Sequence, residues 1–61
     1  MNKYYQQIDE ALIGYENHKP YHNKTMDWIC DRIDWSYRWR KISEKEMIEL
    51  TQRAINILKG Q

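Results

Sequence analysis

The chain has 61 residues, which suffices for one small domain near the lower size limit for folding without disulfides or metals. Ten Lys and Arg against nine Asp and Glu give a net charge of +1, so charge favours no class of partner. One cysteine excludes an internal disulfide, and no apolar run approaches the roughly 18 residues of a membrane span. With no hydrophobic signal segment either, we expect a complete, soluble, cytoplasmic domain over residues 1–61.

The first helix is predicted over residues 2–17. Its apolar residues fall on one side at helical spacing, and Pro20 requires the helix to have ended by about Lys19. Residues 17–22 then form a joint to the next helix. The apolar side comprises Tyr4, Ile8, Ala11, Leu12 and Tyr15.

The second helix is predicted over residues 24–41 and holds all three tryptophans. At about 100° per residue, its apolar positions cover more than half of the circumference, so the helix needs two packing partners. Asn23 or Thr25 caps its start, and Asp34 and Arg38 are spaced for an ion pair. One apolar arc holds Trp28, Trp35, Trp39 and Ile42; the other holds Met26, Ile29, Cys30, Ile33 and Tyr37, where we expect Cys30 to be buried and reduced.

The third helix is predicted over residues 44–59. Ser43 and Glu46 have the spacing of a capping box, and Gly60 suits a C-terminal stop. The fold class is therefore all-α, as a small three-helix bundle or an open three-helix arrangement. The main apolar stripe of this helix is expected at Met47, Ile48, Thr51, Ala54, Ile55 and Leu58, with Leu50 and Ile57 broadening one side.

Catalytic and metal chemistry find little support. His18 and His22, with Cys30 as a third ligand, could be considered as a zinc site. Pro20 lies between the two histidines, however, and rules out the helical spacing of zinc-binding histidine pairs. Neighbouring aspartates disfavour a Cys30 thiolate, and no glycine-rich phosphate loop is present. We expect no enzyme activity, no cofactor and no metal.

Nucleic-acid binding is one alternative. Arg38, Arg40 and Lys41 are interleaved with aromatic residues, and guanidinium groups hold phosphates while rings stack on bases. These cations do not share one helix face, however, so no continuous basic strip forms. A DNA-reading third helix would begin with Glu44 and Glu46, which would face phosphates.

Protein binding has the better physical case. Trp28, Arg32, Trp35 and Trp39 lie in one strip, where Arg32 can stack between rings, and Trp and Arg dominate interface hot spots. If the other helices of the chain cover this strip, it is not available for binding. If they do not, self-association as a homo-oligomer, most simply a dimer, and binding of another protein both remain open, and the sequence does not separate them.

Residues 23–35, NKTMDWICDRIDW, followed by Trp39-Arg40-Lys41-Ile42 and a Ser-x-x-Glu-Met helix start, resemble small helical proteins encoded by phages and prophages of low-GC Gram-positive bacteria. The resemblance covers about the last two-thirds of the chain, carries over no catalytic residues and implies a protein that inhibits a host protein. The leading hypothesis is therefore a non-enzymatic phage or mobile-element protein that binds a bacterial host protein, as an anti-defence (anti-CRISPR-type) inhibitor. The alternatives are a small nucleic-acid-binding regulator and a structural homo-oligomeric phage protein.

Overall fold

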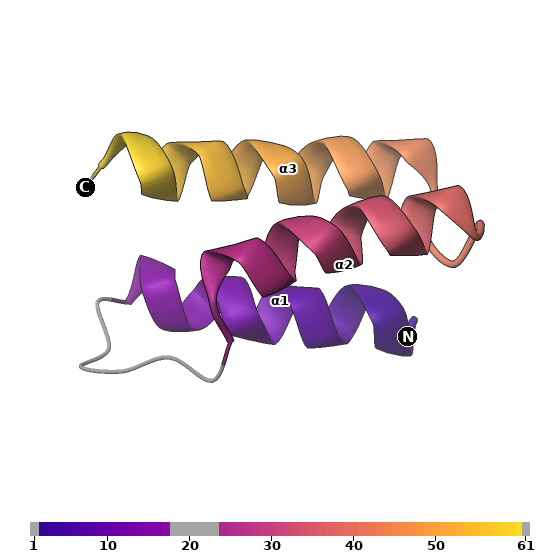
Figure 1. Ribbon diagram of the computed structural model, residues 1–61, viewed down its shortest axis with the longest axis horizontal. Coiled ribbons are helices and arrows are strands. Elements are labelled where there is room, and N and C mark those ends of the chain that lie inside the picture. Colours follow the sequence, from indigo (N-terminus) through magenta and orange to yellow (C-terminus); the bar gives the residue numbers. More distant parts are fainter. Residues whose placement is uncertain (1, 18–23, 61) are drawn as a thin grey trace.

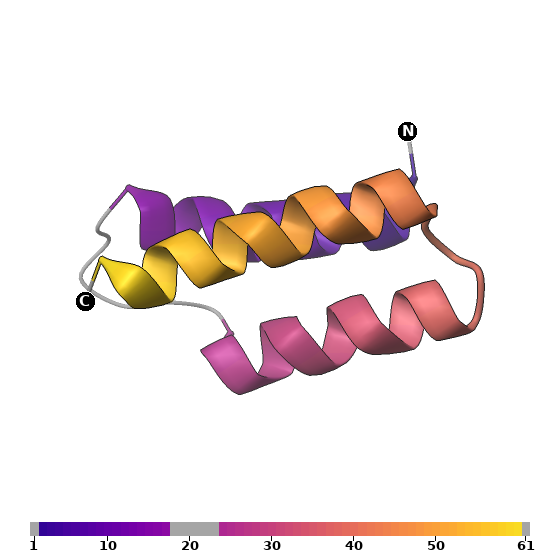
Figure 2. The ribbon, with the colours of Figure 1, turned by 90° about the horizontal axis from the view of Figure 1, so that it is seen from above.

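The fold is a three-helix bundle, seen in a computed structural model that describes residues 2–17 and 24–60. The helices are α1 (Lys3–Glu16), α2 (Met26–Arg38) and α3 (Glu44–Lys59). Figure 1 shows α1 and α3 running in the same direction, with α2 antiparallel to both. Figure 2, seen from above, shows α3 over α1 and α2 beside them, and each helix contacts both others. The all-α prediction is confirmed, and the arrangement is closed.

Side chains at the three N-caps hold the helix starts. The Asn2 side chain accepts the Tyr4 amide at 2.9 Å, and Thr25 Oγ1 accepts the Trp28 amide at 3.1 Å. Ser43 Oγ accepts the Glu46 amide at 3.1 Å, while Glu46 Oε1 accepts the Ser43 amide at 2.8 Å. Each bond satisfies an amide that has no partner within its helix. The predicted capping box and the Thr25 cap are confirmed, whereas the alternative cap, Asn23, lies outside the described residues.

Helix α2 ends earlier than predicted. It stops at Arg38, and Arg40 adopts a left-handed conformation with φ of 58°. The Lys41 amide donates to the Ser36 carbonyl at 2.7 Å and the Arg40 amide to the Tyr37 carbonyl at 3.0 Å, which is the pattern of a Schellman motif. The predicted end at residue 41 was wrong because this turn brings Ile42 into the core, where only 5% of it is exposed.

The core lies along the common axis of the three helices. Its four completely buried hydrophobic residues come from all three, namely Ile8 and Leu12 of α1, Ile29 of α2 and Leu50 of α3. Four further buried residues complete the core cluster, namely Ala11, Ile33, Ile42 and Ala54. Buried apolar surface of this kind supplies most of the folding free energy.

The predicted main stripe of α3 is only partly buried: Ala54 belongs to the core and Met47 packs against it, but three other members are exposed. Ile48, Ile55 and Leu58 are exposed by 55%, 39% and 49%, whereas Leu50 is completely buried. Apolar residues cover so much of α3 that periodicity alone leaves the buried side undecided. The observed orientation buries Leu50, and it also lets Arg53 donate to Glu16 at 2.9 and 2.7 Å and pair with Asp9 on α1.

Candidate protein-binding surface

The predicted Trp–Arg strip, formed by Trp28, Arg32, Trp35 and Trp39, is only partly covered by the bundle. Trp28 is half-buried and packs against the core, whereas Trp35 and Trp39 are exposed by 39% and 62%. The buried side of α2 instead consists of Ile29, Ile33 and Ser36. The helices of the chain therefore leave two of its three tryptophans accessible to a partner.

Arg32 lies between two indole rings. Its guanidinium carbon is 5.2 Å from the centroid of the Trp28 ring and 5.3 Å from that of Trp35. The expected stacking is therefore confirmed. A guanidinium at this distance is attracted to the electron-rich ring faces, by about 0.5–1 kcal/mol at exposed sites. The two contacts place the cation beside both rings.

Tyr4 of α1 extends the strip across a second helix. Its ring centroid is 6.1 Å from that of Trp35, which in turn lies 6.4 Å from Trp39, both at tilted angles. The Asn2 side chain donates to the Lys41 carbonyl and so ties the start of α1 to the α2–α3 turn. Tyr4 packs against the core, as expected from its place on the apolar side of the first helix, but the spacing within α1 cannot show which α2 residue it meets.

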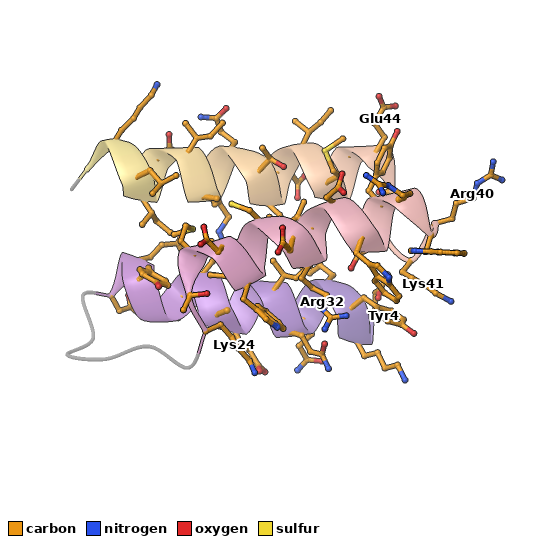
Figure 3. All side chains as sticks on the ribbon, in the orientation of Figure 1. Tyr4, Lys24, Arg32, Arg40, Lys41 and Glu44 are labelled. Carbon is orange, nitrogen blue, oxygen red and sulfur yellow. The ribbon has the colours of Figure 1, made fainter. Side chains whose placement is uncertain are left out.

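Lysines complete the surface. The Nζ atom of Lys24 is 4.9 Å from the Trp28 ring centroid, while those of Lys41 and Lys3 lie 5.5 and 5.6 Å from that of Tyr4. Figure 3 shows Lys24, Arg32, Tyr4 and Lys41 following one another along the seam between α1 and α2. Within residues 2–17 and 24–60 the ion pairs involve Arg38 and Arg53, so Lys3, Lys24, Arg32 and Lys41 take part in none of them. The surface is therefore suited to acidic groups.

The three residues proposed for nucleic-acid contact lie around one open hollow of about 620 Å³ at the α2–α3 turn. Glu44 and Glu46 line the same hollow. Arg38 is moreover paired with Asp34 at 2.8 Å, which confirms the predicted ion pair. Arg40 projects from the turn and Lys41 points towards Tyr4, as Figure 3 shows. Carboxylates next to these cations would repel phosphates.

Cys30 is exposed, so the expectation that it is buried was wrong. Partial burial raises the pKa of its thiol, and the charges of Asp27 and Asp31 raise it further. The expected effect of these two aspartates is confirmed in direction, and a raised pKa disfavours a nucleophilic thiolate. Among the described residues no group of three His, Cys, Asp or Glu side chains is placed to hold a metal, and His18 and His22 lie outside them.

A second apolar surface lies on another side of α2. A groove of about 360 Å³ runs between α2 and α3. It was missed because the prediction placed most of its α3 residues in the core. The groove is lined by Cys30, Ile33, Asp34, Tyr37, Met47, Thr51, Ala54, Ile55 and Leu58.

Comparisons with protein-family models, curated proteins and solved structures gave no match to this chain. The resemblance to phage-encoded proteins therefore stays a prediction. In the part of the chain that the structure describes, none of the helices has the length and apolar character needed to cross a membrane.

Proposed function

We propose that this chain is a non-enzymatic protein-binding module that uses the Trp–Arg strip, extended by Tyr4, to bind and inhibit a bacterial host protein. The observation that carries the proposal is the exposure of Trp35 and Trp39 beside an Arg32 already held against ring faces. Such rigid aromatic and Arg groups lose little conformational entropy on binding, and these residue types dominate interface hot spots.

The charges around the strip indicate what the partner's surface contains. Lys3, Lys24 and Lys41 surround rings that would lie at the centre of the contact. A partner that places carboxylates around an apolar patch would match this pattern, and complementary charge would mainly raise the association rate. If the chain comes from a phage, as its resemblance implies, a defence protein of the bacterial host is the partner to test first.

The test is partner capture with the variant Trp35→Ala/Trp39→Ala. The tagged protein is incubated with lysate of a Gram-positive host at low and moderate salt, and captured proteins are identified by mass spectrometry. We expect the double variant to lose a protein that wild type captures, with its helical circular dichroism unchanged. Ile13→Ala, at an exposed α1 position, is the control that retains capture. Loss of the helical signal in the double variant would show that these tryptophans are needed for folding and would contradict their assignment to binding.

Inhibition needs a second readout. Expression of the wild-type chain is expected to raise the plating efficiency of a sensitive phage on a host that carries the captured defence protein. The double Trp variant should leave plating unchanged. Equal plating with wild type and variant would refute inhibition through this strip.

A small nucleic-acid-binding regulator is the second candidate, favoured by the alternation of rings and cations along the strip and by the arginines at the turn. It predicts a salt-sensitive DNA or RNA complex that Arg38→Glu/Arg40→Glu weakens. A mobility shift at low salt measures it, and no shift with either nucleic acid would remove this candidate. Glu44 and Glu46 beside the arginines make protein binding the better-supported proposal.

A further inference from the structure

The α2–α3 face carries exposed apolar side chains from both helices. We define this face as the residues that line the groove between the two helices. Tyr37, Ile55 and Leu58 are exposed by 39–49%, and Cys30 at the same face is exposed too. Apolar groups gathered on one side of a small protein mark an interaction site, because monomers rarely leave such patches in water.

The charges at the ends of this face are self-complementary. Helix α2 has Asp27 in its first turn and Arg38 in its last, and α3 has Glu44 in its first turn and Lys59 at its end. The two helices are antiparallel, so Arg38 and Glu44 lie at the same end of the face, where they line one hollow. Asp27 and Lys59 lie at the other end.

We propose that the α2–α3 face binds a second copy of this chain about a two-fold axis that runs parallel to the helices. Such an axis preserves the level of each residue along the bundle and places α2 of one copy against α3 of the other. Asp27 then faces Lys59 of the second copy, and Arg38 faces Glu44, at opposite ends of an apolar middle. The product is a four-helix arrangement of α2 and α3 from both copies, in which adjacent helices are antiparallel.

An axis perpendicular to the helices is less favourable. It would place α2 against its own copy, so that Asp34, which lines the groove, would approach Asp34 of the second chain. Like charges brought together at an interface oppose association. With the parallel axis, Asp34 instead faces the α3 side of the groove, which includes the uncharged Thr51.

This inference goes beyond the proposed function and uses a different side of α2. A dimer formed in this way leaves Trp35, Trp39 and Tyr4 at the α1–α2 seam, so each dimer would present two Trp–Arg strips. Two linked strips increase the apparent affinity for a partner that has two matching surfaces. Self-association and partner capture are measured separately, so the failure of one proposal is distinguishable from the failure of the other.

The first experiment measures molar mass by sedimentation over micromolar to millimolar concentrations. We expect wild type to pass from monomer to dimer, and Ile55→Gln to raise the dimer dissociation constant roughly 10-fold or more. Ile13→Gln is a matched control, because Ile13 and Ile55 are both 39% exposed but Ile13 lies on α1. Glutamine favours helix, so circular dichroism should stay unchanged. Leu58→Gln, in the last turn, provides an independent second variant. A wild-type monomer at millimolar concentration, or equal dissociation constants for both Ile variants, would overturn the proposal.

The second experiment tests the direction of the axis. Asp27→Lys and Lys59→Asp each place like charges opposite each other and should weaken the dimer. The combined variant exchanges the two charges and should restore most of the wild-type affinity. With a perpendicular axis, Asp27 would instead face Arg38, and Lys59 would face Glu44, of the second copy. The combined variant would then break both of these ion pairs. A dimer weaker than that of either single variant would therefore refute the parallel axis.

Cys30 gives a readout without mutation. With the parallel axis, the two copies of Cys30 lie at the same level on facing sides of the groove. A short bismaleimide should therefore link wild type into a covalent dimer, and Ile55→Gln at the same concentration should give much less of it. Absence of the linked dimer under conditions where sedimentation shows dimer would contradict this placement.

Discussion

The two surfaces that share α2 differ in how the chain itself covers them. At the Trp–Arg strip, Arg32 and Lys24 lie over ring faces and Trp35 packs beside Tyr4. At the α2–α3 face, Ile55 and Leu58 border a groove without such cover. Long charged side chains can shield rings from water while their heads stay hydrated. The strip can therefore persist in a monomer, whereas the aliphatic face gains most from being covered by another molecule.

The largest expected effect tests whether the α2–α3 face contributes to the folding of one copy. Leu50→Ala removes a completely buried side chain and should lower the free energy of unfolding by about 2–5 kcal/mol. Leu58→Ala is the matched control on the exposed side and should change it by less than about 0.5 kcal/mol. Urea unfolding at micromolar concentration, below dimer formation, measures both. Similar losses in the two variants would show that Leu58 is part of the core.

The next effect concerns Arg53, which joins α3 to α1 through ion pairs with Glu16 and Asp9. Its hydrogen bonds lower the pKa of Glu16 below the usual value of 4.5. A carboxyl with a lowered pKa stabilises the fold above its unfolded-state pKa, and this contribution is lost as the pH falls through its folded-state pKa. Because both side chains are partly exposed, the contribution is about 1 kcal/mol.

Urea unfolding between neutral and acidic pH measures this contribution. Wild type should lose more stability than Arg53→Gln as the pH falls below 4.5. At neutral pH, Arg53→Gln should be the less stable protein. Parallel pH profiles for the two proteins would show that the ion pair does not contribute to folding.

A smaller effect is expected at the turn that separates the two surfaces. Arg40 occupies a left-handed conformation that costs a non-glycine residue roughly 1 kcal/mol or somewhat more. Arg40→Gly should therefore raise the melting temperature, although glycine also gains entropy in the unfolded chain, so that part of the gain is lost. Thermal unfolding measures the change, and Arg40→Ala, which keeps the strain, should show no such rise.

The smallest expected effect concerns Arg32, whose guanidinium covers two rings of the Trp–Arg strip. Arg32→Gln removes the cation between Trp28 and Trp35 and should cost about 0.5–1 kcal/mol of folding stability. Tryptophan emission should shift to longer wavelength as the rings become more hydrated. Arg38→Gln, on the outer face of α2, is the control that leaves emission unchanged. An unchanged spectrum in Arg32→Gln would mean that the guanidinium does not shield these rings.

Local signals carried most of the fold prediction. The Ser43 and Glu46 capping box, the Thr25 cap and the Asp34–Arg38 pair each join residues within four positions, so their spacing in the sequence is enough to identify them. The stacking of Arg32 between Trp28 and Trp35 is likewise local to α2. For the candidate site, the sequence therefore identified the strip but not the residues of other elements that border it.

The sequence by itself determined three helices, their starts and the line of aromatic and Arg residues on α2, because these depend on helical periodicity and on hydrogen bonds between near neighbours. Only the tertiary structure decided the rotation of α3, the end of α2 and the meeting of Tyr4 with Trp35. The Arg53 contact with Glu16 joins residues 37 positions apart, and Ile42 reaches the core only when the turn after α2 closes. Packing of three helices at once selects among apolar faces that periodicity leaves equivalent, and this selection left the α2–α3 face exposed.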